Sequence, residues 1–259
     1  MLIRTTALTA ILTLAGLGFA GSAEGQYFGV DATAQTLGYT GCFTDNSGAL
    51  TNATFAGALS DPAGVTLSSP YYGSMFADVG AASEARPAEL HAQATAHAHS
   101  INATPGFSGS APYGQGYAHF YDRLTVKSDV LPKGTPVTIV FGNDVEIATW
   151  TYTGLYDGYI DMTLQIGAGS ARSRWTASYL YGVTAADTPQ VRIQTTVGSQ
   201  LSVDGKLRVQ TKTFYYDRPV GFGGDIKADA TARVVVREIP DGVTLQSASG
   251  IDYPVAPAN

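Results

Sequence analysis

Apolar and polar residues alternate with a period of two along much of this 259-residue chain. The clearest run lies between Gly158 and Gly167. Its even-numbered positions hold Ile160, Met162, Leu164 and Ile166. Successive side chains of a β-strand point to opposite faces of the sheet, so this run predicts a strand with one buried face and one solvated face. No long helical period competes with this pattern.

Many other stretches show the same pattern between Gly, Pro, Asp and Asn residues. A hairpin is predicted where 191–203 meets 206–214 across Asp204 and Gly205, a pair suited to the positive backbone angles of a type I′ turn. Two stretches, 38–70 and 104–115, are interpreted as loops or irregular strands because they are rich in turn-forming residues. The remaining strands are expected at 30–36, 73–79, 88–99, 116–128, 137–142, 145–153, 172–182 and 226–237.

These stretches amount to about ten strands, more than one open twisted sheet commonly holds. Each strand also has one face that needs cover. The chain is therefore expected to be all-β, with two antiparallel sheets packed face to face as a jelly-roll-like β-sandwich. A closed β-barrel is the alternative. No repeat or long linker divides the chain, so one domain is expected over 24–259.

Asp122 lies on the apolar face of its predicted strand, together with Phe120 and Leu124. Burial of an unpaired carboxylate is costly. Asp122 is therefore expected either at a sheet edge or as an acceptor of hydrogen bonds. We interpret it as a structural residue, with ligand binding as the alternative.

The N-terminal residues 1–23 have the pattern of a secretory signal peptide. Arg4 supplies a positive charge, Ala7 to Leu17 is an apolar run, and the small residues 20–23 offer a cleavage site. The apolar run is shorter than the roughly 20 residues that a membrane-spanning helix needs. We therefore expect an exported protein with no membrane span after cleavage.

The composition adds three constraints. With 44% hydrophobic and 14% charged residues, the chain lies outside the range of disordered sequences. The net charge of −6, without a visible cluster of Lys and Arg, argues against nucleic acid and equally against a polyanionic ligand. Cys42 is the only cysteine, so no intramolecular disulfide can form.

Three stretches together carry a family resemblance. Leu90–Asn102 is rich in small residues. Ala118–Val140 combines an aromatic residue, an Asp, a strand, a Gly-Thr-Pro turn and another strand. Ala228–Tyr253 combines a strand, Pro-Asp-Gly, Ser-Ala-Ser-Gly and a tyrosine. In these features the chain resembles the secreted β-sandwich proteins of Gram-negative bacteria that carry a PEP-CTERM sorting tail and are processed by exosortase.

The resemblance implies a sandwich without established catalytic residues, located in the periplasm, on the cell surface or outside the cell. The sequence departs from the family's pattern at its end. Pro254–Asn259 stands where members continue into a Val-Pro-Glu-Pro motif, a hydrophobic helix and a basic cluster. The expectation is a protein without the sorting tail, which puts exosortase processing in doubt.

Three histidines, His91, His97 and His99, are expected on one face of a strand, opposite a row of alanines. Same-face neighbours along a strand lie about 6–7 Å apart, so two imidazoles could share a zinc or copper ion. Further ligands, such as His119, would have to come from a neighbouring strand. The alternative is a set of surface histidines on a sheet face.

Aromatic residues form the second candidate site. Trp150, Trp175, Tyr71 and Tyr72 are candidates for stacking on sugars, whereas the alternative places them in the core or in cross-strand pairs. The carboxylates Asp144, Glu146, Asp157 and Asp161 could form a pair of the glycosidase type, with surface charge as the alternative.

The sequence contains neither a Gly-x-Ser-x-Gly motif nor a His-Glu-x-x-His motif. We therefore expect a non-enzymatic structural or interaction protein of the bacterial envelope or extracellular matrix, with no cofactor. Its expected partners are extracellular polysaccharide or envelope proteins. The alternatives are a carbohydrate-binding module and, third, a hydrolase that uses dispersed carboxylates.

Overall fold

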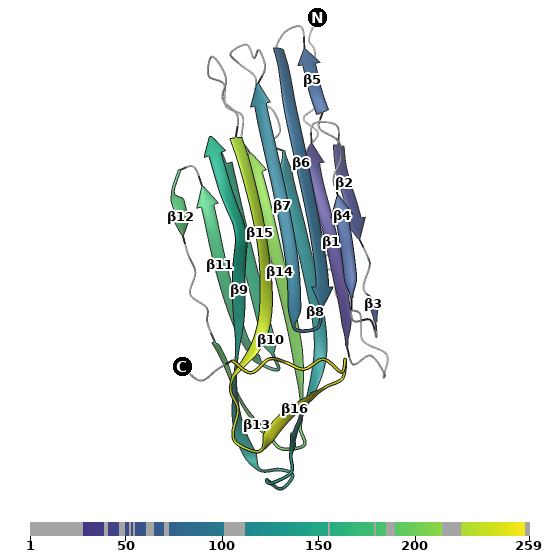
Figure 1. Ribbon diagram of the computed structural model, residues 1–259, viewed down its shortest axis with the longest axis vertical. Coiled ribbons are helices and arrows are strands. Elements are labelled where there is room, and N and C mark those ends of the chain that lie inside the picture. The colour runs from purple at the N-terminus through teal and green to yellow at the C-terminus, as the bar shows by residue number, and fades with distance from the viewer. Residues whose placement is uncertain are drawn as a thin grey trace, which may run out of the picture.

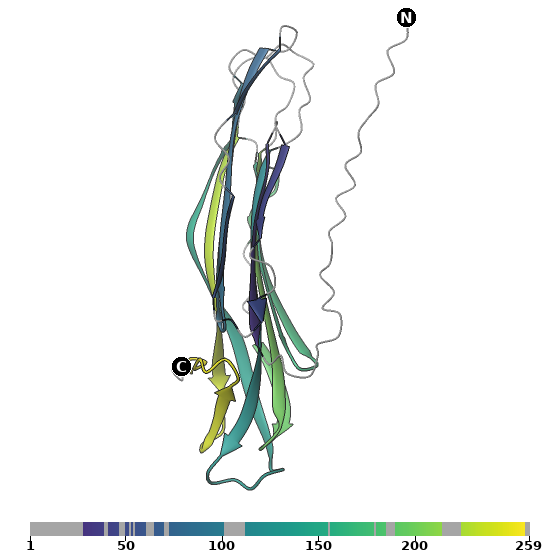
Figure 2. The same cartoon turned by 90° about the vertical axis from the view of Figure 1, so that its right-hand side faces the viewer.

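The computed structural model describes residues 28–38, 41–46, 50–51, 53, 55–60, 65–69, 73–100, 112–154, 156–178, 180–184, 190–213 and 224–256. These residues form β-strands, turns and short connections, arranged as two elongated layers (Figures 1 and 2). Within them, no helix is long and apolar enough to span a membrane.

The first layer is a nine-stranded antiparallel sheet. Its main path runs in the order β12-β11-β10-β14-β8-β1-β2, with β16 paired to β8 and β3 paired to β1. The bounds are β12 (Gly182–Thr184), β11 (Gly169–Ser178), β10 (Tyr156–Ile166), β14 (Gln200–Thr213), β8 (Tyr113–Ser128), β1 (Gly29–Gly38), β2 (Gly41–Asn46), β16 (Val243–Ser247) and β3 (Leu50–Thr51).

The second layer is a seven-stranded antiparallel sheet in the order β13-β9-β15-β7-β6-β4, with β5 paired to β6. The bounds are β13 (Gln190–Thr196), β9 (Pro136–Gly154), β15 (Gly224–Glu238), β7 (Glu89–Ser100), β6 (Gly73–Arg86), β4 (Ala56–Ser60) and β5 (Val65–Ser69). Figure 2 shows the two sheets edge-on, one over the other. The predicted two-sheet sandwich is confirmed, and the closed barrel is wrong.

The alternating residues form the core that the sequence predicts. In β10 the four even-numbered apolar side chains from Ile160 to Ile166 are fully buried, whereas Asp161 and Thr163 face outward and are only partly covered. Phe141 of β9 and Leu207 of β14 are also fully buried, so both sheets contribute large side chains to this part of the core. The buried core residues of the two sheets belong mainly to one continuous cluster.

The core is much thinner between β8 and the pair β6–β7. A Cβ atom on Gly114 would lie 2.3 Å from the backbone oxygen of Gly80, and one on Gly116 would lie 2.5 Å from that of Ala82. The backbones of the two sheets therefore come too close for a side chain at these two positions. The inward residues of β7 that follow Leu90 match this spacing, since they are Ala92, Ala94, Ala96 and Ala98.

The predicted hairpin at Asp204–Gly205 is wrong. Both residues lie inside β14, where Gly205 is in register with Phe120 of β8. A Cβ atom on Gly205 would lie 2.4 Å from the Phe120 ring. The position therefore needs glycine because the ring occupies this space, and not because the chain turns here. The actual turn comes at Val197–Gly198, and it joins β13 to β14 in the opposite sheet.

Other strand boundaries also differ from the prediction. The stretches 137–142 and 145–153 form one strand, β9, which has an irregularity in its pairing opposite Asp229 and Ala230. Region 38–70 contributes the short strands β2 to β5. These short strands raise the described total to sixteen, above the predicted ten or so.

Asp122 is only 2% exposed and accepts several hydrogen bonds, as its position on the apolar face predicts. The hydroxyl groups of Ser247, Ser249 and Tyr253 donate to its Oδ2 atom at 2.6, 2.8 and 3.2 Å, and the backbone N–H of Arg123 donates to Oδ1 at 2.7 Å. Asp122 of β8 therefore anchors the segment that follows β16.

Candidate functional site

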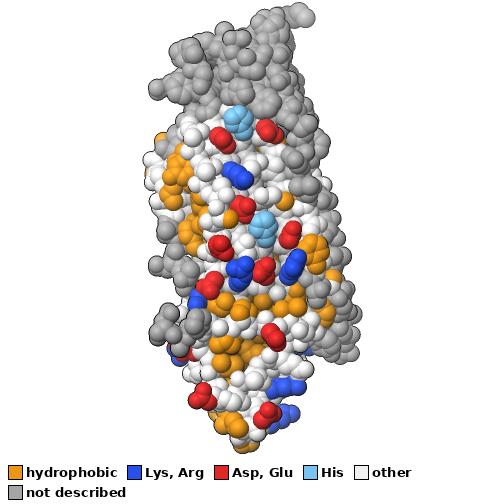
Figure 3. All heavy atoms as spheres, in the orientation of Figure 1, with side chains coloured by type: hydrophobic (Ala, Val, Ile, Leu, Met, Phe, Trp, Pro, Cys, Tyr) orange, Lys and Arg blue, Asp and Glu red, His pale blue; other side chains and the backbone are white. Residues whose placement is uncertain are grey.

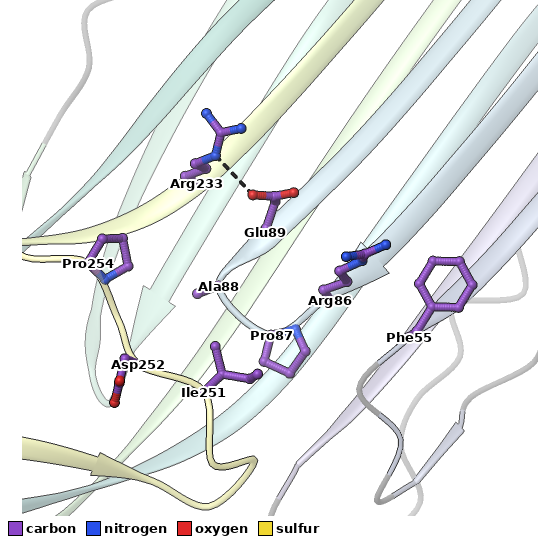
Figure 4. A pocket seen from close by; sticks show the side chains of 9 residues that line it. All are labelled: Phe55, Arg86, Pro87, Ala88, Glu89, Arg233, Ile251, Asp252 and Pro254. Carbon is purple, nitrogen blue, oxygen red and sulfur yellow. Dashed lines mark hydrogen bonds and ion pairs between the residues drawn. The ribbon is translucent and has the colours of Figure 1, made fainter.

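A pocket of about 390 Å³ opens at the end of the seven-stranded sheet, where the β6–β7 turn meets the C-terminal segment (Figure 4). Its walls combine exposed apolar side chains with charged ones. The lining residues are Phe55, Arg86, Pro87, Ala88, Glu89, Arg233, Ile251, Asp252 and Pro254.

Phe55 and Arg86 form one end of the pocket. Phe55 precedes β4 and is 48% exposed, and the guanidinium carbon of Arg86 lies 5.2 Å from the centre of its ring. A Cβ atom on Gly57 would lie 3.3 Å from Cζ of Phe55, so the glycine leaves room for the ring beside β4. This arrangement presents an aromatic ring and a cation side by side.

The middle of the pocket holds an ion pair. Nε of Arg233 donates to Oε2 of Glu89 at 2.9 Å, and Glu146 lies 3.5 Å from the same guanidinium. The hydrogen bond that Arg233 donates to Glu89 is the main cause that raises the pKa of Arg233. In the described part of the chain, Arg86 and Asp252 make no ion pair, so their charged groups are available to a ligand.

The wall opposite Phe55 is a stretch of extended chain from Ile251 to Pro254. Tyr253 points into the core and reaches Asp122, while Ile251 is 40% exposed and Asp252 is exposed. Burial, followed by the nearby charge of Asp122, raises the pKa of Tyr253 well above its usual value, so its hydroxyl remains a donor. Beyond this stretch, Val255 forms a parallel bridge with Val236 of β15.

The floor of the pocket is the tight turn between β6 and β7. Ala88 has a φ of 64°, a left-handed conformation that is uncommon for residues other than glycine. Its backbone oxygen accepts a hydrogen bond of 2.9 Å from the N–H of Val234, which ties the turn to β15. The floor and the opposite wall are therefore both fixed to the sandwich.

These side chains suit reversible binding. An exposed ring, a free guanidinium and a free carboxylate can contact a ligand, and the pocket's size lies at the lower end of the range for small-molecule sites. Among the described residues that line it, there is no Ser, Cys, His or Lys to act as a nucleophile or as a base near neutral pH.

The aromatic residues that the sequence singles out lie elsewhere. Trp175 is 9% exposed and belongs to the core, which is the alternative placement that the sequence leaves open for the aromatic residues. Trp150 is half-buried against the core, and its Nε1 atom is buried without a hydrogen-bond partner. Tyr71 and Tyr72 lie outside the described residues.

His91 and His97 lie on the outer face of the seven-stranded sheet, opposite the buried alanines of β7. This face is turned toward the viewer in Figure 3, where acidic and basic side chains are interspersed. His91 contacts Asp229 at 2.8 Å, and His97 lies in register with Asp78 and Asp225 on the two flanking strands. The side chain of His99 lies outside the described residues.

His119 cannot complete a metal site with these histidines. It lies on the outer face of the other sheet, where it contacts Asp204 at 3.0 Å. Within the described ranges, no three His, Cys, Asp or Glu side chains form a group that could hold a metal ion.

The four carboxylates considered for a hydrolase are divided between the two sheets. Asp144 and Glu146 lie on β9 and pair with Arg237 and Arg233. Asp157 and Asp161 lie on β10 of the other sheet, where Asp161 accepts a hydrogen bond of 2.8 Å from Arg172. The two pairs point away from one another and cannot flank a common bond.

The pocket residues carry no signal that the sequence alone would reveal. Phe55 belongs to a region interpreted as loop, and Arg86, Arg233 and Asp252 are single charges in three separate stretches. Only the sheet register brings them together, because Arg86 and Arg233 both lie opposite Glu89.

Comparison with protein families, curated proteins and solved structures gives no match for this chain. The resemblance to the PEP-CTERM type of secreted protein therefore stays a prediction.

Proposed function

We propose that this chain is an exported, non-enzymatic interaction protein of the bacterial envelope or extracellular matrix, and that the pocket is its binding site. The observation that carries the proposal is the combination of an exposed Phe55, an unpaired Arg86 and an unpaired Asp252 around one cavity. Together these groups offer a ligand apolar surface and charged hydrogen-bonding groups within one cavity.

The charged groups support binding rather than hydrolysis. Acid–base cleavage of a glycoside needs one carboxyl group that donates a proton and a second that acts as base or nucleophile. In the pocket, Glu89 is held by the guanidinium of Arg233 at 2.9 Å, and Asp252 lies on an exposed stretch of chain. Neither carboxyl group is placed in the apolar surroundings that favour a proton donor.

Export is supported by the signal-like residues 1–23, which lie outside the described residues. The test is to express the full chain in a Gram-negative bacterium, fractionate the cells and sequence the N-terminus of the protein. We expect a processed chain that begins near Glu24 in the periplasm, at the cell surface or in the medium. An intact N-terminus in the cytoplasm would contradict export.

A carbohydrate-binding module is the second candidate, and the exposed ring of Phe55 favours it. The apolar face of a sugar stacks on aromatic rings, and sugar hydroxyl groups form hydrogen bonds with Arg and Asp side chains. The pocket supplies all three groups within one cavity.

Retention of the purified chain on a panel of immobilised polysaccharides tests this binding. We expect at least one polymer to retain it, and Phe55→Ala to weaken binding at least about tenfold. Tyr159→Ala is the matched control, because Tyr159 also lies under an arginine, Arg174 at 4.8 Å, but on the other sheet. Equal losses of polysaccharide binding in Phe55→Ala and Tyr159→Ala would count against the pocket as the binding site.

A further inference from the structure

We infer that the ligand of the pocket is a glycan whose sugar units include one with a carboxylate, and that Arg86 binds this carboxylate. The inference rests on the proposed function and names the ligand class of the same site. It follows from which charges in the pocket are already paired and which are not.

Arg86 is the cation that a ligand can use. Arg233 is occupied by Glu89 and Glu146, at 2.9 and 3.5 Å. Arg86 makes no ion pair within the described residues, and its guanidinium carbon lies 5.2 Å from the centre of the Phe55 ring. The paired N–H groups of a guanidinium match the two oxygens of a carboxylate.

The rest of the pocket suits a sugar ring. Phe55 and Ile251, 48% and 40% exposed, both line the cavity, and Pro87 lies beside Ile251 on the side toward Phe55 (Figure 4). They provide exposed apolar surface against which a sugar ring can pack. Asp252 can accept hydrogen bonds from sugar hydroxyl groups, whereas a second carboxylate of the ligand would be repelled there.

The overall charge restricts the ligand further. The chain carries a net charge of −6, so a polymer with a carboxylate on every unit is repelled at long range. A glycan with sparse carboxylates meets little of this repulsion and still satisfies Arg86. The site therefore fits a mostly neutral polysaccharide with isolated uronate-type units.

The test uses a matched pair of polymers: a xylan with glucuronate side groups, and the same xylan after its carboxylates have been reduced to hydroxymethyl groups. Binding of the full chain to each polymer is measured by affinity electrophoresis at near-physiological salt. We expect the native xylan to bind about tenfold to a hundredfold more tightly than the reduced one.

Three variants locate the effect. Arg86→Gln is expected to abolish the preference for the native xylan, so that the variant binds the two xylans about equally. Arg86→Lys is expected to retain only part of the preference, because lysine keeps the charge but loses the paired donors. Arg174→Gln is the matched control, since this arginine stacks on Tyr159 in the other sheet, and it is expected to change nothing.

The contrary outcomes separate the two proposals. Equal binding of the two xylans, or an equal loss in Arg86→Gln and Arg174→Gln, overturns the carboxylate inference and leaves the interaction role standing. Binding to a glutamate-rich peptide with the same Arg86 dependence, but to neither xylan, overturns the glycan as ligand. If Phe55→Ala also leaves binding to every polymer and to the peptide unchanged, the pocket is not the site and the proposed function fails.

Discussion

At the scale of single residues, Asp122 explains why two of the resembling stretches occur together. It lies in the first half of Ala118–Val140, and its hydroxyl partners Ser247, Ser249 and Tyr253 lie at the end of Ala228–Tyr253. The Ser-Ala-Ser-Gly sequence and the tyrosine are therefore hydrogen-bond donors to one buried carboxylate. This cluster also holds the wall of the pocket in place.

We predict that Asp122→Asn lowers the free energy of unfolding by about 2–3 kcal/mol, because the new amide presents a donor to groups that already donate. Urea denaturation measures the change. Glu238→Gln is the control, since the ion pair of Glu238 with Arg192 is more than half exposed and should contribute less than about 1 kcal/mol. Equal effects in the two variants would contradict a structural role for Asp122.

Asp31 offers a prediction of pH dependence. It is 4% exposed on β1, opposite His119, and its Oδ1 atom has no hydrogen-bond partner among the described residues. Burial raises the pKa of Asp31 above 3.8, and the charge of His119 offsets part of the rise. Between the unfolded and the folded pKa the folded state binds more protons, so this residue's contribution to stability falls as the pH rises through that window.

The substitution Asp31→Asn removes this pH-dependent loss of stability, because an asparagine side chain does not ionise in this pH range. We expect the stability of the variant relative to the parent chain to increase as the pH rises from about 4 to about 7. Urea denaturation of both proteins across this range measures the difference. A difference that shrinks as the pH rises would contradict the assignment.

At the scale of strands and turns, alternation predicts β10 well because its buried face consists of large apolar residues. It fails at Asp204–Gly205 because the reason for that glycine is the Phe120 ring on the adjacent strand. The short strands between 41 and 69 are predicted only as loops or irregular strands, since pairing with β1 and β6 rather than side-chain pattern defines them. The pocket is not predicted for the same reason, because the pairing register of β6, β7 and β15 brings its charged residues together.

The close approach of the sheets at Gly116 gives a test at this scale. We expect Gly116→Ala to lower the free energy of unfolding by about 1–3 kcal/mol, because the added methyl group meets the backbone of β6 and β7. Gln115→Ala, one residue earlier on the outer face, is expected to have a small effect. Thermal unfolding measures the stability of both variants. If Gly116→Ala is as stable as the parent chain, the two sheets lie farther apart at this position than the structure shows.

At the scale of the whole molecule, the continuous core predicts that the two sheets unfold together. Each sheet carries one tryptophan, Trp150 on β9 and Trp175 on β11. Variants with Trp150→Phe or Trp175→Phe therefore report on one sheet each by fluorescence. We expect the denaturation midpoints of the two variants to coincide after correction for the stability change of each substitution. Two separate unfolding transitions would contradict a single domain.

The central claim is that ligands bind at the pocket where the β6–β7 turn meets the C-terminal segment. Hydrogen–deuterium exchange with and without a retained polysaccharide tests it most directly. We predict slower exchange at 55–57, 86–89 and 251–254, and no change along the outer face of β8 and β14. Protection confined to that outer face, or to β9 and β12, would contradict the account.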